Sequence, residues 1–102
     1  MHDCGIARGD RWLATWLPRI FRSSEYRSGT TAVFLTWDED DGKTGNHVLT
    51  LVMSRRIRPN TRSGARFDHY SLLRTTEELL GVRARLGAAA RSAPDMRAAF
   101  DL

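Results

Sequence analysis

The stretch TTAVFLTW, residues 30–37, decides how this chain of 102 residues folds. It is rich in β-branched and aromatic side chains and is apolar on both faces, which is typical of a buried strand. A second run of this kind, HVLTLVMS at residues 47–54, follows after a short loop. A loop this short permits an antiparallel hairpin. Because two strands make only a marginal sheet, two interior-type strands indicate a piece of a larger sheet.

Four consecutive carboxylates, Asp38 to Asp41, follow the first strand directly. In a parallel α/β sheet the functional groups lie at the carboxyl ends of the strands, so the position of this cluster is informative. Neighbouring carboxylates repel one another unless solvent, a cation or basic groups compensate them. The cluster by itself is therefore either a solvated acidic turn, which is the more common case, or half of a metal site.

Helical periodicity predicts an amphipathic helix over residues 10–22, with Asp10 as its N-cap. Pro18 falls inside this pattern and is expected to kink or end the helix, because proline removes a backbone donor. The apolar face of the helix, which we expect to pack in the core, consists of Trp12, Leu13, Trp16, Leu17 and Ile20.

A second amphipathic helix is predicted over residues 68–80, where Gly81 is the stop signal. His69 and Ser71 stand at its start, so we assign both to capping rather than to catalysis. A short helix near residues 96–100 completes the order α-β-β-α plus a short C-terminal helix, in one domain at residues 1–102. The apolar face of the second helix is expected to consist of Leu72, Leu73, Thr76, Leu79 and Leu80.

The charge of the chain is basic, with 16 Lys and Arg against 12 Asp and Glu. Arginines gather in the loop at residues 55–66, and such a loop can bind phosphate groups or nucleic acid. It lacks the interleaved aromatic residues of a single-strand stacking platform, so a solvated loop is the default. No apolar run is long enough to span a bilayer, and no hydrophobic signal region follows Met1. The sequence therefore does not determine the cellular compartment of the protein.

Six short motifs occur in order along nearly the whole chain: HD at residues 2–3, GDRWL at 9–13, SGTTAVF at 28–34, TWDE at 36–39, NHV at 46–48 and HYSLLRTTE at 69–77. Each motif is weak alone. Their order and spacing together resemble the C-terminal portion of the phosphoesterase family in the alkaline phosphatase superfamily. That family includes bacterial acid phosphatases and phospholipase C-like enzymes, and the resemblance is greatest to its acid-phosphatase-like actinobacterial branch.

The resemblance implies the C-terminal part of a three-layer α/β/α alkaline-phosphatase-like fold and metal-dependent hydrolysis of a phosphate-ester substrate. It also implies that Asp38 and Glu39 are ligands of a divalent metal ion of unknown identity, while Asp40 and Asp41 stay in a solvated loop. His2 occupies the place of a family histidine near the phosphate, where it would donate a hydrogen bond or protonate the leaving oxygen. A histidine this close to a terminus is, alternatively, simply frayed.

In the family, the other metal ligands and the Ser or Thr nucleophile lie upstream of the segment that this chain resembles. We therefore expect a missing N-terminal segment, a chain that is inactive by itself, and an upstream cysteine as the partner of Cys4. Full-length relatives are often secreted. The alternative is a non-enzymatic basic binding module that uses loop 55–66, although a nucleic-acid partner is not favoured. A degenerate fragment without function is the third reading.

Overall fold

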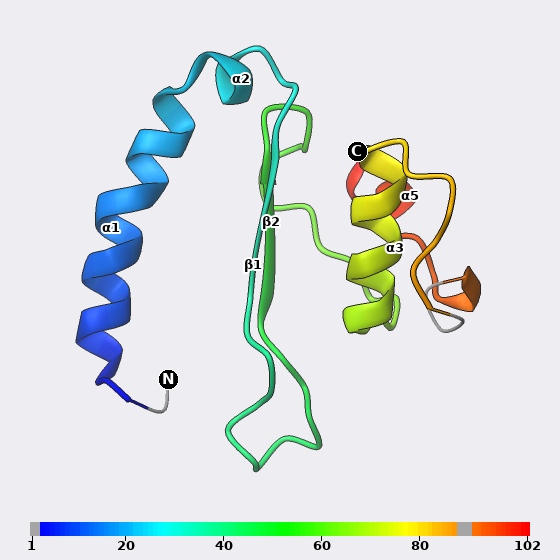
Figure 1. Ribbon diagram of the computed structural model, residues 1–102. Helices are drawn as coiled ribbons and strands as arrows, with labels where there is room; N and C mark the ends of the chain where they lie inside the picture. Colours follow the sequence, from blue (N-terminus) through cyan, green and yellow to red (C-terminus); the bar gives the residue numbers. More distant parts are fainter. Residues whose placement is uncertain (1–2, 88–90) are drawn as a thin grey trace. The chain divides into compact units, whose positions relative to one another are not determined.

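The structure, a computed structural model, describes residues 3–87 and 91–102 (Figure 1). It divides into two compact units, Met1–Arg55 and Arg56–Leu102, and each unit is described by itself. The first contains two helices and two strands, and the second contains helices and loops. This order confirms a mixed α/β fold with the predicted succession α-β-β-α and a short C-terminal helix. The single domain expected for residues 1–102 stays a prediction.

The first helix, α1 (Ile6–Arg22), starts one turn earlier than predicted, with Gly5 rather than Asp10 at its N-cap. Pro18 does not end it, because the loss of one backbone donor leaves the other turns intact. At its end, the Ser23 side chain accepts the Tyr26 amide at 3.2 Å and starts the short helix α2, Ser24–Arg27. One serine therefore separates the two helices.

The two tryptophans of α1 are exposed, so their predicted place in the core is wrong for the described residues. Trp12 is 59% exposed and Trp16 is 43% exposed. The Arg19 guanidinium instead lies over the Trp16 ring, 4.9 Å from the ring centroid, in a cation–π contact. Helical periodicity identified the apolar stripe of α1 correctly, but it does not determine which element covers that stripe.

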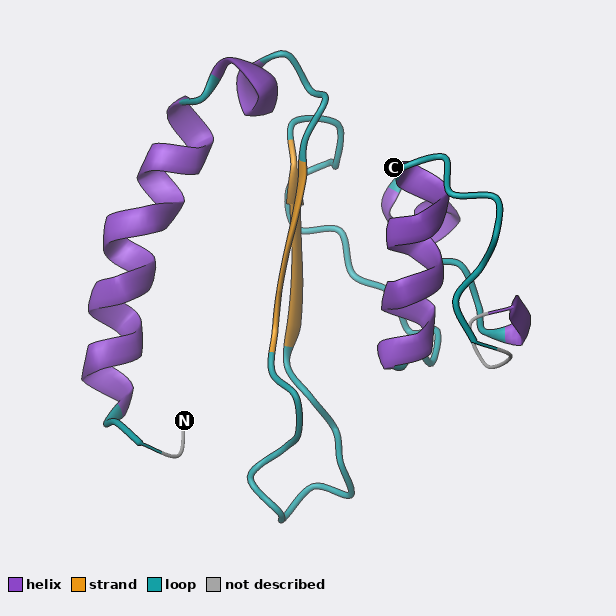
Figure 2. Cartoon of the chain, in the orientation of Figure 1, coloured by secondary structure: helices purple, strands orange, loops and turns teal. Residues whose placement is uncertain are grey.

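The predicted antiparallel hairpin is confirmed by β1 (Ala32–Thr36) and β2 (Thr50–Ser54), drawn as orange arrows in Figure 2. At the loop end, Thr36 faces Thr50 in the register, and their hydroxyl oxygens lie 2.9 Å apart. The predicted burial on both faces is not found among the described residues. All of β1 is half-buried, and Leu51 on β2 is 46% exposed.

Helix α3 (His69–Leu79) begins with a capping box between Asp68 and Ser71. The Ser71 amide donates to Asp68 Oδ1 at 2.8 Å, and the Asp68 amide donates to Ser71 Oγ at 3.2 Å. Capping by Ser71 is therefore confirmed, while the N-cap itself is Asp68. The helix stops at Gly81 as predicted, where φ is +68°, a conformation that glycine adopts without strain.

The face of α3 that is buried is polar, which corrects the predicted leucine face. Ser71 and Thr75 are fully buried and Glu77 is 3% exposed, whereas Leu80 is 74% exposed. The buried hydrophobic residues in the described part of the chain are Ala93 and Met96, which precede α5 (Arg97–Phe100). Small polar side chains let a neighbouring backbone approach α3 closely and satisfy its amides.

Within residues 3–87 and 91–102, no helix is both long and apolar enough to cross a bilayer.

We expect Asp68→Ala to lower the free energy of unfolding of the second unit by about 1 kcal/mol, because α3 then loses the acceptor of its first-turn amide. The matched control is Asp68→Asn, since asparagine is an equally good N-cap. Urea unfolding followed by far-UV circular dichroism measures both variants. Equal stability of Asp68→Ala and Asp68→Asn would show that this cap does not hold α3.

Candidate functional site

The candidate site is the acidic cluster after β1. Asp38 and Glu39 are exposed at the point where the strand ends and the hairpin loop begins. Both therefore lie where the sequence placed them, on the surface beyond the strand. The strand pairing that the structure describes is antiparallel, so the argument from a parallel-sheet edge gains no support from it. Ligation of a metal by the two carboxylates stays a prediction.

Asp40 lies in the hairpin loop, as predicted, and its carboxylate organises that loop. Oδ1 accepts the Gly42 amide at 2.7 Å. Oδ2 accepts the Thr44 amide at 3.0 Å, the Thr44 hydroxyl at 2.8 Å and the Asn46 amide at 2.8 Å. In return, Asn46 Oδ1 accepts the Asp40 amide at 3.3 Å. The loop therefore closes around one side chain.

The sequence carries a local signal for this loop that was missed. Residues 40–46 read DDGKTGN, so Gly, Thr and Asn follow Asp40 at two, four and six positions. An aspartate that accepts the amide two residues later is the start of an Asx turn. Gly42 and Gly45 take positive φ values of 77° and 64°, which allow the chain to wrap around the carboxylate.

The hydrogen bonds also set the charge state of Asp40. The Thr44 hydroxyl, followed by the Gly42 amide, lowers the pKa of Asp40 from 3.8 to about 2. The folded loop therefore stabilises the ionised form of the Asp40 carboxylate. Because the folded pKa is lower than the unfolded one, the stabilisation is fully present above pH 3.8 and is lost as the pH falls through about 2.

The residues present match a divalent cation in ligand type but not in number. Hard carboxylate oxygens suit such ions, which take six or more ligands. Asp40 already uses both carboxylate oxygens within the loop, whereas Asp38 and Glu39, the predicted ligands, are exposed. Among the residues that the structure describes, no three His, Cys, Asp or Glu side chains are grouped so that they could hold a metal.

The other predicted site residues are dispersed. His2, the candidate catalytic histidine, lies outside the described residues. Cys4 is half-buried and carries a free thiol. In the loop at residues 55–66, all five predicted arginines are exposed, as expected for a solvated loop: Arg55, Arg56, Arg58, Arg62 and Arg66.

We expect Asp40→Ala to open the hairpin loop, because the variant loses every acceptor of the Gly42, Thr44 and Asn46 amides. Their hydrogen exchange, followed by NMR, should become about tenfold faster, since hydrogen bonds to charged groups are among the stronger ones. Asp41→Ala is the matched control, because Asp41 accepts the neighbouring Lys43 amide instead. The wild-type loop should open in the same way as the pH falls through about 2. Unchanged exchange in Asp40→Ala would contradict this role.

Two comparisons with known proteins identify a family and a relative to which the chain is similar. Residues 1–83 match the model of the Phosphoesterase family. The chain is also 34% identical over 82 residues to a phosphatidylinositol-3-phosphatase of Mycobacterium tuberculosis. That match covers 80% of this chain and 26% of the relative, so the chain spans about a quarter of the length of that protein. No solved structure gives a significant match.

The family match contains α1, the hairpin with its acidic cluster, and α3. It therefore includes all six motifs on which the resemblance rested, since the last of them ends at residue 77. The family hydrolyses phosphate esters. By the extent of this match and by its similarity to a curated phosphatase, the chain belongs to the Phosphoesterase family.

Proposed function

We propose that this chain contributes part of the site of a metal-dependent phosphoesterase, with Asp38 and Glu39 as ligands of a divalent metal ion. The observation that carries the proposal is the exposed position of two adjacent carboxylates directly after β1. Asp40 is committed to the loop, whereas Asp38 and Glu39 are exposed at the end of β1. This geometry lies inside the segment that matches the family, residues 1–83.

The chemistry of the pair suits phosphate-ester hydrolysis. Adjacent carboxylates repel each other, and a divalent cation removes that repulsion. The ion, when bound, would polarise a phosphoryl oxygen and so stabilise the charge that develops there. The carboxylates of Asp38 and Glu39 would hold the ion at the rim of the hairpin, and the Asp40 loop would keep both residues in place. His2 would donate a hydrogen bond to the phosphate or protonate the leaving oxygen.

Two carboxylates do not complete the coordination of a divalent ion. We therefore propose that the remaining ligands and the nucleophile come from parts of the family domain other than residues 3–87 and 91–102, and we expect no turnover by the 102-residue chain alone. For the substrate class we propose a phosphate monoester on a lipid headgroup. The support is the similarity to a protein that is named a phosphatidylinositol-3-phosphatase.

The test is a Mn²⁺ titration of the isotopically labelled chain, followed by NMR. Paramagnetic broadening should begin at residues 38 and 39, with a dissociation constant on the order of 1 mM because the protein supplies few ligands. The double variant Asp38→Asn/Glu39→Gln should abolish the broadening. The matched control, Asp41→Asn, removes one carboxylate from the same loop and should preserve it. Broadening that survives in the double variant would refute ligation by this pair.

The same samples test the assignment of the nucleophile. With p-nitrophenyl phosphate or phosphatidylinositol 3-phosphate and Mg²⁺, Mn²⁺, Ca²⁺ or Zn²⁺, the chain should show no turnover above the buffer. Turnover that Asp38→Asn abolishes would show that the chain carries its own nucleophile. That result would overturn the inactive-chain part of the proposal while supporting the metal site.

A second candidate function is a non-enzymatic basic binding module, which the exposure of all five arginines in loop 55–66 favours. Arginine suits bidentate contacts with phosphates. Binding to DNA or to anionic vesicles should then weaken by roughly 10²–10³-fold between about 50 and about 200 mM salt, as expected for up to five phosphate contacts. Absence of binding at the lower salt concentration would remove this candidate.

A further inference from the structure

The hairpin loop contains the dipeptide Asp41–Gly42, and the sequence contains no other Asp-Gly pair. In such a pair the backbone nitrogen of the glycine can attack the side-chain carboxyl carbon of the aspartate, because glycine has no Cβ to hinder the approach. Both residues are exposed, and a Cβ at Gly42 would have no atom within 4 Å apart from its own chain neighbours. The loop therefore leaves room for a covalent rearrangement of this bond.

The Asp41 side chain is already folded toward the bond that follows it. Its Oδ1 accepts the Lys43 amide at 3.1 Å, which closes an Asx turn across Gly42. Such a turn brings the carboxyl group of its first residue close to the next backbone nitrogen. Gly42 has a φ of +77°, which glycine adopts without strain. The turn thus supplies the proximity that ring closure between Asp41 and Gly42 needs.

The Asp40 carboxylate opposes this ring closure. Its Oδ1 accepts the Gly42 amide at 2.7 Å. The Gly42 nitrogen must give up its proton before it can attack, and a carboxylate this close disfavours the negative charge that the nitrogen would then carry. Oδ2 accepts the Thr44 and Asn46 amides, so the carboxylate cannot turn away from Gly42 without losing those bonds. Asp40 therefore holds the Gly42 amide in an unreactive state.

We propose that Asp41–Gly42 is a site of aspartate isomerisation and that the Asp40 carboxylate suppresses the reaction in the folded chain. First, a bond forms between the Gly42 nitrogen and Asp41 Cγ, while the bond from Cγ to the hydroxyl oxygen of the carboxyl group breaks. This hydroxyl leaves with the amide proton as water, which gives a succinimide ring. Water then adds to one carbonyl of the ring. Addition at the backbone carbonyl breaks its bond to the Gly42 nitrogen and leaves isoaspartate at position 41.

The rearranged main chain does not fit the loop. Isoaspartate lengthens the main chain by one carbon atom between Asp41 and Gly42, inside the segment whose amides converge on Asp40. The Gly42 amide then no longer has the spacing from Asp40 on which its hydrogen bond depends. We expect the modified loop to open as it does in Asp40→Ala. The inference is independent of the proposed phosphoesterase function, because the reaction needs neither metal ion nor substrate.

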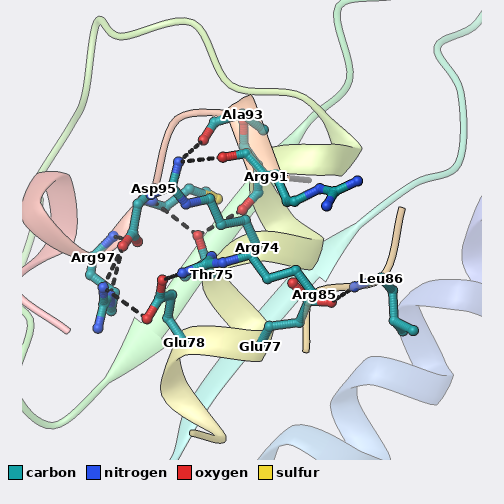
Figure 3. A network of polar contacts seen from close by, with 12 residues as sticks. Arg74, Thr75, Glu77, Glu78, Arg85, Leu86, Arg91, Ala93, Asp95 and Arg97 are labelled. Atoms are coloured by element: carbon teal, nitrogen blue, oxygen red, sulfur yellow. Dashed lines mark hydrogen bonds and ion pairs between the residues drawn. The ribbon is translucent and has the colours of Figure 1, made fainter. Parts of the chain in front are cut away.

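Asp95 provides an internal comparison, since it makes the same turn as Asp41 without the glycine. Its Oδ1 accepts the Arg97 amide at 2.9 Å. Figure 3 shows the Asp95 carboxylate directed at the Arg97 guanidinium, with which it forms an ion pair of 2.6 Å. The next residue, Met96, is buried, and its amide donates to Thr75 Oγ1 at 2.9 Å. The turn at Asp95 therefore lacks the exposed glycine nitrogen that the reaction needs.

The experiment is prolonged incubation of the full chain at neutral pH in heavy-oxygen water. Each passage through the succinimide incorporates one labelled oxygen, and peptide mass spectrometry with electron-transfer fragmentation distinguishes isoaspartate from aspartate. The chain unfolded in guanidinium chloride gives the rate without the loop. We expect label and isoaspartate at Asp41 and not at Asp95, with the folded wild-type chain slower than the unfolded one.

Variants identify the group that suppresses the reaction. Asp40→Ala should accelerate the reaction at Asp41 about tenfold in the folded chain, the factor expected for the loss of a hydrogen bond to a charged group. Asp40→Asn keeps an oxygen acceptor without the charge and should give an intermediate rate. Asp10→Ala is the matched control, because it removes an exposed carboxylate of the same unit outside the loop and should leave the rate unchanged.

The site is refuted if Asp41 reacts no faster than Asp95 in the unfolded chain, because the Asp-Gly bond is then not reactive. Suppression by Asp40 is refuted if the folded wild-type chain reacts as fast as the unfolded one, or if Asp40→Ala reacts at the wild-type rate or more slowly. Circular dichroism monitors the fold of each variant. Should Asp40→Ala unfold the chain, Asp40→Asn and the folded and unfolded wild-type rates decide between the same outcomes.

Discussion

Backbone amides outside helices and strands need acceptors, and in this chain side-chain oxygens supply them. Asp40 accepts three amides and closes the hairpin loop, Asp68 caps α3, and Thr75 accepts the Met96 amide. In the described residues, by contrast, the buried hydrophobic side chains are those of Ala93 and Met96, and β1 is half-buried. Polar acceptors, rather than a large apolar core, therefore determine the local structure of both units.

The same constraint distinguishes Asp40 from the proposed metal ligands in the acidic cluster. An oxygen that already binds backbone amides is a poor candidate for a metal ion, because ligation would cost those bonds. Asp40 is a poor candidate for this reason, and Asp38 and Glu39 are exposed at the end of β1. Their position after β1 could be read from the sequence, since a strand pattern ends where the carboxylates begin. Membership of the Phosphoesterase family gives this pair its proposed chemistry.

Sequence reasoning succeeded where the interacting residues are close in the chain. The hairpin and capping by Ser71 depend on one loop and one helical turn. It failed for the buried face of α3, because the decisive bond joins Thr75 to Met96 across 21 positions and periodicity reports only apolar faces. It also placed Trp12 and Trp16 in a core, although an apolar stripe indicates a surface to be covered and not the element that covers it.

The most direct test of the account is a carboxyl-carbon NMR titration of residues 38–40, with and without Ca²⁺. The account predicts that Asp40 titrates near pH 2 and does not respond to the ion, because its oxygens are bound within the loop. The carboxyl-carbon signals of Asp38 and Glu39 are predicted to shift on addition of Ca²⁺, because the ion binds these two carboxylates. A response to Ca²⁺ at Asp40, with none at Asp38 and Glu39, would contradict the central claim.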